Sequence, residues 1–372
     1  MLRRVFFTMI AVVACAEPSG PSTHLHSQRV LIAGTDEGAI VVDLDWRGII
    51  RRSGPRFLSQ ASSVFNGRGD LLTAGVIAGN TTVLAGLDIE TGLELWRTTV
   101  NQGNTPSVVD GVELGATMIT ANPSRPEVFL SRSVQGGVGG IAGYDYDRRR
   151  ITRFFGPVST RLRAVAATPV SAAHPEGCLV LGLDAIVSGN VRAFLHVACG
   201  TSYPVRDSIP IALPSRTVVQ MELTPDRREL VVMTDMELIK FDVSTLAVTV
   251  RATRPLAAPF FMSRATGRFI IPDVGSALVA SSGLIYLLDA NLELSSIIDL
   301  RILPFGERPL GILSAEESRD GKWLYIVGGV PPGGPLYGPE ATHILVIEKS
   351  TGSVVDTVNL DAYGGGRAVL VP

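Results

Sequence analysis

The segment GLDIETGLELWRTT, Gly86 to Thr99, contains the pattern on which the fold of this chain depends. An apolar run ends at the acidic residue Asp88, a short polar turn with a Thr-Gly pair follows, and a second run mixes apolar and polar residues. Alternation with a period of two predicts a half-buried strand, and a short turn with glycine between two such runs predicts an antiparallel hairpin. The segment therefore predicts two neighbouring strands of one sheet.

Six segments of the chain repeat this arrangement of strand, acidic residue, polar turn and strand. Their acidic marker residues are Asp43, Asp88, Asp145, Asp242, Asp289 and Glu348. The gap between Asp145 and Asp242 is about twice the usual spacing, so we predict a further unit around FLHVACGTSYPV with His196 at the marker position. Self-similarity at a period of roughly 50 residues is typical of repeat architectures, and the count is seven units.

A second motif precedes these pairs of strands. It is clearest in SRDGKWLYIVG, Ser318 to Gly328, and in LTPDRRELVVM, Leu223 to Met233, with looser versions in FNGRGDLLTAG and RATGRFIIP. Each unit is thus predicted to contain four antiparallel strands, and one such sheet cannot bury both of its faces alone. Radial stacking of the sheets buries them, so we predict an all-β fold, a seven-bladed β-propeller over residues 29–372.

Closure of the ring follows from the two ends of this region. The first unit has no inner strand of its own, since RVLIAG already supplies its second strand. The segment GGGRAVLVP is left over after the seventh unit, and it resembles LRAVAATPV, the predicted inner strand of the fourth. We therefore predict that Arg367 to Val371 pairs with Val30 to Gly34, completes the first blade and protects the sheet edges.

These motifs resemble those of YVTN/WD-like and quinoprotein-type propellers, from Arg29 to the end of the chain. The resemblance implies a fold and no particular activity, because propellers carry many unrelated functions. Quinone-docking propellers repeat a tryptophan at the position of Trp96 in most blades. Here the other units have Arg, Phe, Val, Ile or Thr at that position. We interpret Trp96 as a residue that packs one blade.

The first 14 residues are predicted to be a lipoprotein signal peptide. Arg3 and Arg4 give the segment a positive start, and the apolar run Val5 to Val13 is shorter than the ~20 residues that a membrane-spanning helix requires. The run ends in VVAC, which resembles the cleavage motif of bacterial lipoproteins and implies lipidation of Cys15. An ordinary secretory signal with an incidental cysteine is the alternative.

Residues 15–28 are rich in Pro, Ser and Gly, and we expect them to form a flexible tether. Together with the signal, this tether predicts a protein of the bacterial cell envelope, anchored to the outer membrane or cell surface by lipid.

The two remaining cysteines, Cys178 and Cys199, are expected to be paired, because exported proteins experience oxidising conditions. Between them lie two apolar runs around a Ser188-Gly189 turn, which predicts a β-hairpin. Counting outward from the turn, the cysteines face each other at a non-hydrogen-bonded pair, where Cα atoms lie ~4.5 Å apart. We predict a disulfide; two buried free thiols are the alternative.

Other motifs give weaker indications of chemistry. GVGGIA, Gly137 to Ala142, matches a dinucleotide-binding fingerprint, but a predicted strand follows it where that motif requires a helix. We interpret it as a mobile loop between a second and a third strand. The five histidines are isolated from one another or lie in the tether: His24, His26, His174, His196 and His343. We assign no catalytic residue, cofactor or metal ligand.

The formal net charge of −2 argues against a nucleic-acid partner, which selects a basic surface. Our leading hypothesis is a monomeric, lipid-anchored propeller that serves as a binding platform for an envelope protein or polymer. The longest insertion, Val327 to His343, is expected to be a surface excursion, with a recognition lip around Tyr337 and Glu340 as the alternative.

Two other functions remain open at this point. The first is a propeller hydrolase or lactonase with a divalent metal at the central channel, held by loop carboxylates such as Asp36, Asp184, Asp235 and Asp273. The second is a scaffold that resembles the propeller lipoprotein of the outer-membrane assembly machinery.

Overall fold

The computed structural model describes residues 28–58, 61–78, 81–101, 114–134, 137–155, 161–170, 175, 177–199, 209–213, 215–253, 260–274, 281–300, 311–329, 343–360 and 364–371. These residues form 28 strands in seven four-stranded antiparallel sheets. None of them belongs to a helix with the length and apolarity needed to cross a membrane.

We number the blades in chain order and give their strands from the inside outward. Blade 1 contains β28 (Gly364–Val371), β1 (Arg29–Thr35), β2 (Gly38–Asp43) and β3 (Gly48–Ser53), and blade 2 contains β4 (Ser62–Phe65), β5 (Leu71–Ile77), β6 (Thr81–Leu87) and β7 (Glu94–Asn101). Blade 3 contains β8 (Leu114–Ala121), β9 (Glu127–Val134), β10 (Gly137–Asp145) and β11 (Arg150–Phe155). Blade 4 contains β12 (Arg161–Ala167), β13 (Cys178–Val187), β14 (Asn190–Cys199) and β15 (Ile209–Ala212). Blade 5 contains β16 (Val218–Leu223), β17 (Glu229–Thr234), β18 (Glu237–Asp242) and β19 (Val248–Thr253). Blade 6 contains β20 (Phe261–Met262), β21 (Phe269–Val274), β22 (Ser281–Leu288) and β23 (Leu294–Asp299). Blade 7 contains β24 (Gly311–Glu317), β25 (Trp323–Gly329), β26 (His343–Glu348) and β27 (Ser353–Asn359).

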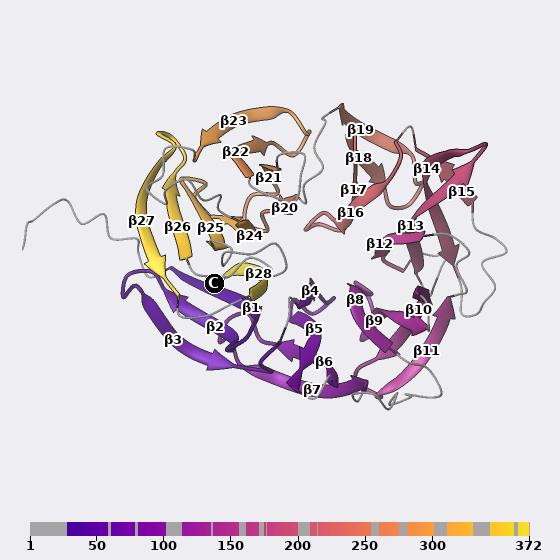
Figure 1. Ribbon diagram of the computed structural model, residues 1–372, viewed down its shortest axis with the longest axis horizontal. Helices are drawn as coiled ribbons and strands as arrows, with labels where there is room; N and C mark the ends of the chain where they lie inside the picture. The colour runs from indigo at the N-terminus through magenta and orange to yellow at the C-terminus, as the bar shows by residue number, and fades with distance from the viewer. Residues whose placement is uncertain are drawn as a thin grey trace, which may run out of the picture.

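The sheets stand radially around a common centre, with one inner strand of each blade facing it (Figure 1). Apolar side chains fill the space between neighbouring blades. Between blades 1 and 7, for example, Val30, Ile32 and Val42 pack with Tyr325 and Val346, and all five are almost completely buried. Each sheet thus buries both faces against its neighbours, which confirms the predicted seven-bladed propeller.

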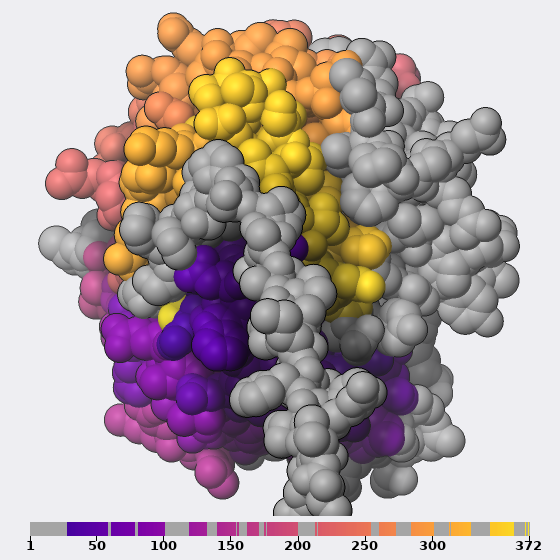
Figure 2. Space-filling model, turned by 90° about the vertical axis from the view of Figure 1, so that its left-hand side faces the viewer, coloured from indigo at the N-terminus to yellow at the C-terminus, as the bar shows by residue number. Residues whose placement is uncertain are grey.

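The last strand closes the ring, as predicted. Strand β28 pairs antiparallel with β1, so that Val371 faces Arg29 and Val369 faces Leu31. Figure 2 shows the N-terminal residues of the propeller directly against its C-terminal residues. The first sheet therefore combines strands from the two ends of the chain, and β28 covers the edge of β1.

The acidic marker residues fix the turn between the third and the outer strand. Asp88 shows the arrangement: its Oδ1 accepts hydrogen bonds of 2.8 Å from the main-chain N–H groups of Glu90 and Thr91. In blade 5, hydrogen bonds from Ser244 and Thr245 to the equivalent Asp242 lower the pKa of this carboxyl to about 2. The repeated acid is a turn-forming residue, because a carboxylate stabilises such turns locally.

In blade 4 the prediction for the marker was wrong. The Thr168 N–H donates to the carbonyl of Cys178, as the Thr224 N–H donates to that of Glu229 in blade 5. Since Cys178 pairs with Cys199 as Glu229 pairs with Asp242, Cys199 occupies the marker position. His196 lies within β14, because the two strands of this hairpin are ten residues long and pair without a register shift.

Trp96 packs a blade, as we interpreted it. Its ring stacks on Tyr146 of blade 3 with centroids 5.1 Å apart and covers Gly86 on the neighbouring strand. A Cβ at Gly86 would lie 2.5 Å from the indole Nε1, so the glycine makes room for the ring. Trp96 therefore joins blades 2 and 3.

The interpretation of GVGGIA as a loop was wrong. Gly137 to Ala142 lies in strand β10, which pairs with β9. The register shifts between Val138 and Gly140, and Gly140 has a φ of 148°, which favours glycine at this irregularity. The glycines thus serve a bulged strand, and no helix follows them.

Candidate functional site

The central channel contains a cavity of about 200 Å³ near one end. The inner strands of blades 2 to 6 and the turns that follow them form its wall. The polar and charged residues of this lining are Ser63, Asn66, Thr120, Gln220, Glu222, Thr224, Arg227 and Arg264. We call this end of the channel the mouth.

The mouth opens on the face that carries the inner turns. Because neighbouring strands are antiparallel, the turn between inner and second strand and the turn between third and outer strand lie at the same end of each of blades 2 to 7. We call this side of the ring the turn face. Strand β1 begins there, since Arg29 pairs with Asp43, the last residue of β2. The chain therefore enters the propeller on the same face as the mouth.

Arg227 of blade 5 reaches across the mouth. Its guanidinium donates from Nη1 to the carbonyl of Pro123 at 2.7 Å and from Nη2 to the carbonyl of Gly67 at 3.2 Å, with a longer contact of 3.5 Å to that of Asn66. These carbonyls belong to the inner turns of blades 2 and 3. In Figure 1, β4 lies across the ring centre from β16, so one side chain connects opposite sides of the propeller.

A second arginine crosses the mouth from blade 6. The guanidinium carbon of Arg264 lies 3.8 Å from the ring centroid of Phe65, on the inner strand of blade 2. A cation over an aromatic face at this distance is attracted by the ring, typically by about 0.5–1 kcal/mol. The mouth thus carries two positive charges, and Glu222 is the acidic residue in its lining.

The wall of the mouth is held by side chains that bond to neighbouring blades. The Gln220 amide donates from Nε2 to the Phe260 carbonyl and accepts from the Phe260 N–H, both at 3.0 Å. Asn66 orders the inner turn of blade 2 by accepting from the N–H groups of Arg68 and Asp70 at 2.9 Å, and it donates to the Tyr146 hydroxyl at 3.2 Å. The carbonyls that Arg227 contacts are therefore fixed in position.

The carboxylates predicted as metal ligands are placed differently from the prediction. Asp184 and Asp273 lie in strands β13 and β21, whereas Asp36 and Asp235 lie in turns. Asp184 is buried, and its Oδ2 accepts from Arg163 at 2.6 Å and from Thr217 at 3.0 Å, while its Oδ1 has no hydrogen-bond partner.

Asp184 and Asp235 both contact Thr217. The Thr217 N–H lies 3.4 Å from Asp235 Oδ1, and the Arg216 N–H donates to the same oxygen at 3.0 Å. Asp184 thus connects blade 4 to the segment that enters blade 5, and Asp235 orders that segment from within blade 5. In the part of the chain that the structure describes, no group of three His, Cys, Asp or Glu residues is placed to hold a metal ion.

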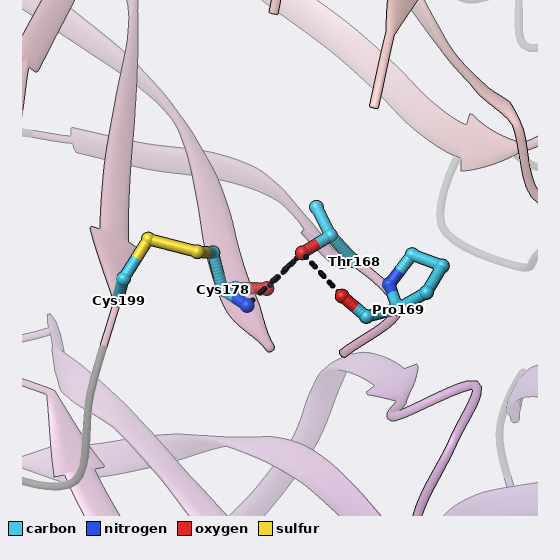
Figure 3. The surroundings of a disulfide bond; sticks show 4 residues. All are labelled: Thr168, Pro169, Cys178 and Cys199. Atoms are coloured by element: carbon cyan, nitrogen blue, oxygen red, sulfur yellow. Dashed lines mark hydrogen bonds between the residues drawn. A yellow bond between two sulfur atoms is a disulfide. The ribbon is translucent and has the colours of Figure 1, made fainter. Parts of the chain in front are cut away.

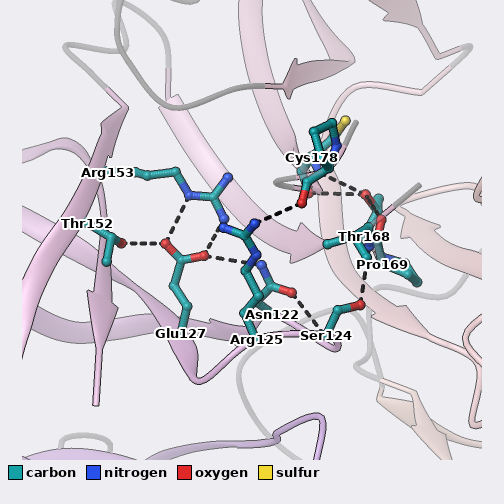
Figure 4. A network of polar contacts seen from close by, with 11 residues as sticks. Asn122, Ser124, Arg125, Glu127, Thr152, Arg153, Thr168, Pro169 and Cys178 are labelled. Atoms are coloured by element: carbon teal, nitrogen blue, oxygen red, sulfur yellow. Dashed lines mark hydrogen bonds and ion pairs between the residues drawn. The ribbon is translucent and has the colours of Figure 1, made fainter. Parts of the chain in front are cut away.

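A buried ion pair in blade 3 was not predicted. Glu127 and Arg153 face each other with side chains that are 5% and 4% exposed, and Thr152 and Asn122 also donate to the Glu127 carboxylate (Figure 4). Burial raises the pKa of Glu127, but the hydrogen bonds from Arg153, Thr152 and Asn122 outweigh it and lower the pKa overall. No local sequence pattern indicated this pair, because Glu127 and Arg153 are 26 residues apart in the chain.

The predicted disulfide is present between Cys178 and Cys199 (Figure 3). The hairpin register confirms the counting from the turn, with Val187 facing Asn190 and the cysteines facing each other. Thr168 Oγ1 accepts from the Cys178 N–H at 3.0 Å, which fixes this end of the blade to its inner strand.

Replacing both cysteines, Cys178→Ser and Cys199→Ser, is expected to lower the free energy of unfolding by about 3 kcal/mol, because the bridge limits the entropy of the unfolded chain. Chemical denaturation of the oxidised wild type and the double variant measures this difference. Equal unfolding midpoints would show that the bridge does not contribute to stability.

The remaining candidates do not assemble into a site within the described residues. Burial lowers the pKa of both His196 and His343, which lie in blades 4 and 7. Most of the insertion between β25 and β26, and the residues Cys15, His24, His26, His174, Tyr337 and Glu340, lie outside the described residues.

Comparison with known proteins supports the fold. No protein-family model and no curated protein matches the sequence. Among solved structures, dihydro-heme d1 dehydrogenase NirN in complex with DHE is similar, with 13% identity and a TM-score of 0.52 over 93% of this chain and 75% of that one.

The β-propeller domain of Cps50 (Swd1) from Myceliophteria thermophila also matches, with 13% identity and a TM-score of 0.49 over 83% of this chain and 88% of that domain. The chain is a seven-bladed β-propeller. At these identities the similarity concerns the fold alone.

Proposed function

We propose that this chain is an exported, lipid-anchored propeller of the bacterial cell envelope and that it serves as a binding platform. The observation that carries the proposal is the bridge between Cys178 and Cys199, because disulfides persist in oxidising compartments and are rare in the cytosol. The signal-like segment that ends at Cys15 agrees with export.

The place where the chain enters the propeller suits a tether. Gln28 is held at the turn face, where its carbonyl accepts from the Leu44 N–H and its side chain accepts from the Tyr325 hydroxyl. The preceding segment from Cys15 can span at most roughly 45 Å when extended. A lipid on Cys15 would therefore hold the propeller close to the membrane while leaving the ring intact.

The binding role rests on the mouth of the channel. Five blades contribute to its lining, and the interblade hydrogen bonds of Gln220 and Asn66 hold that lining in place. A site built from several rigid strands is suited to bind a ligand without rearrangement.

The hydrolase hypothesis receives less support. Arg163 already neutralises Asp184, and main-chain N–H groups engage Asp235, so these two carboxylates have structural partners. No observation favours the assembly scaffold, and we do not propose it.

The anchoring is tested by Cys15→Ser. We expect the wild type in the membrane fraction and the variant unprocessed or released, because stable anchoring requires more than one acyl chain on the cysteine. Cell fractionation and immunoblotting measure the distribution. The Cys178→Ser, Cys199→Ser variant is the control and should stay with the membrane. A Cys15→Ser protein with unchanged processing and membrane association would refute the anchor.

A further inference from the structure

Arg227 is a cation at the mouth whose contacts are all with neutral groups. Its hydrogen bonds go to the main-chain carbonyls of Asn66, Gly67 and Pro123, and no carboxylate among the described residues pairs with it. By contrast, Arg153 pairs with a carboxylate within its blade. A planar guanidinium matches the geometry of carboxylate and phosphate groups and forms bidentate pairs with them, which add energy and specificity to its hydrogen bonds. The mouth therefore offers a positive group without an anion.

The backbone at Arg227 supports a role for its side chain. In the inner turns of blades 2, 6 and 7 the equivalent position is glycine with a positive φ: Gly69 at 94°, Gly267 at 68° and Gly321 at 69°. Arg227 adopts the same conformation with a φ of 62°, which costs a residue with a side chain about 1 kcal/mol. The outer turn of blade 3 also has an arginine in this conformation, Arg149 with a φ of 54°. Strain alone therefore does not indicate a ligand, whereas the reach of Arg227 into the mouth does.

We propose that the mouth binds a small soluble anion, a carboxylate or a phosphate, and that Arg227 is the residue that recognises it. Arg264 supplies a second positive charge in the same lining, against the single acidic residue Glu222. The cavity of about 200 Å³ accommodates a ligand somewhat larger than benzene, which occupies an engineered cavity of about 150 Å³ in another protein. The proposal deepens the binding role proposed above and does not depend on the lipid anchor.

The substitution Arg227→Gly tests the proposal. It removes the guanidinium and introduces glycine, which the inner turns of blades 2, 6 and 7 have at this position. We therefore expect the variant to fold. Arg149→Gly is the matched control, because it makes the same change in the same backbone conformation on an outer turn. Arg227→Lys keeps the charge and removes the planar fork. A thermal unfolding curve for each variant confirms that it is folded.

Binding is measured by titration calorimetry, in which inorganic phosphate or succinate is added to the full chain purified in detergent. We expect the wild type and Arg149→Gly to bind at least one of these anions with affinities within about twofold of each other. Arg227→Gly should bind the same anion about tenfold or more weakly than the wild type, because hydrogen bonds to charged groups are strong. Arg227→Lys should fall between them.

Wild-type protein that binds neither anion, or folded Arg227→Gly that binds as tightly as wild type, would overturn the proposal. Either result leaves the anchoring intact, because fractionation of the Cys15→Ser variant measures that separately.

Discussion

A chain that ends at Gly364 is expected to be insoluble or cooperatively destabilised. This truncation removes nearly all of β28, so the main-chain groups of β1 lose the partners that run from Arg29 to Ala33. It also removes Val369, which packs with Leu31 and Ala33 in the core between blades. An unpaired edge along an apolar sheet promotes aggregation. Soluble yield and the unfolding transition of the purified chain measure the effect.

The matched control for this truncation removes the other end of the chain. Starting the chain at Ser27 deletes the signal and most of the tether but keeps Gln28, which contacts Leu44 and Tyr325. We expect this protein to be soluble and as stable as the chain with its tether. A C-terminally truncated protein that is equally soluble and stable would show that β28 does not hold the ring closed.

The substitution Glu127→Ala is expected to destabilise the protein by about 3–5 kcal/mol, because it leaves the Arg153 guanidinium buried without its counter-charge. Urea denaturation measures the change. Arg153 also lies over the ring of Phe129, 5.0 Å from its centroid, and would remain fixed there. A loss of less than about 1 kcal/mol would show that water or other groups compensate the charge.

The pair Glu127→Leu with Arg153→Met is the control, since replacing a whole buried ion pair by apolar residues of similar volume is often neutral. The sign of the pH dependence gives a second check. The lowered pKa of Glu127 means that its ionised form stabilises the folded state above its unfolded pKa. The free energy of unfolding of the wild type, relative to that of the double variant, should therefore decrease as the pH falls through the folded pKa of Glu127.

The sequence predicted the features that depend on local patterns. The hairpin between Cys178 and Cys199 was predictable because a tight Ser188-Gly189 turn sets the register of two uninterrupted strands. The acidic turns were predictable because an Asp such as Asp88 bonds to N–H groups two and three residues ahead. Closure by β28 followed from counting strands, which does not require knowledge of tertiary contacts.

The same patterns misled where the strand lengths differ from the usual repeat. Spacing suggested His196 as the marker of blade 4, although the unusually long β13 and β14 place Cys199 there. Glycines suggested a loop at Gly137 to Ala142, although a strand with a bulge accommodates them. In both cases pairing across the sheet decided the outcome, and a local pattern does not contain that information.

The mouth was not predictable from single motifs, because its contacts join residues that are distant in the chain. Arg227 contacts Gly67 and Pro123, which precede it by 160 and 104 residues. One signal was nevertheless present: in TPDRR the first arginine, Arg227, occupies the position of the glycine in SRDG. Among the inner turns of blades 2, 5, 6 and 7, Arg227 therefore stands where the other three turns have glycine.

The mass spectrum of the mature protein isolated from bacterial membranes tests whether the propeller is exported and anchored by lipid. We expect a chain that begins at Cys15, carries the mass of attached acyl chains and, without reduction, yields a digest in which the peptides of Cys178 and Cys199 are linked. A chain that retains its first 14 residues, or one with an unmodified N-terminus and two free thiols, would contradict this expectation.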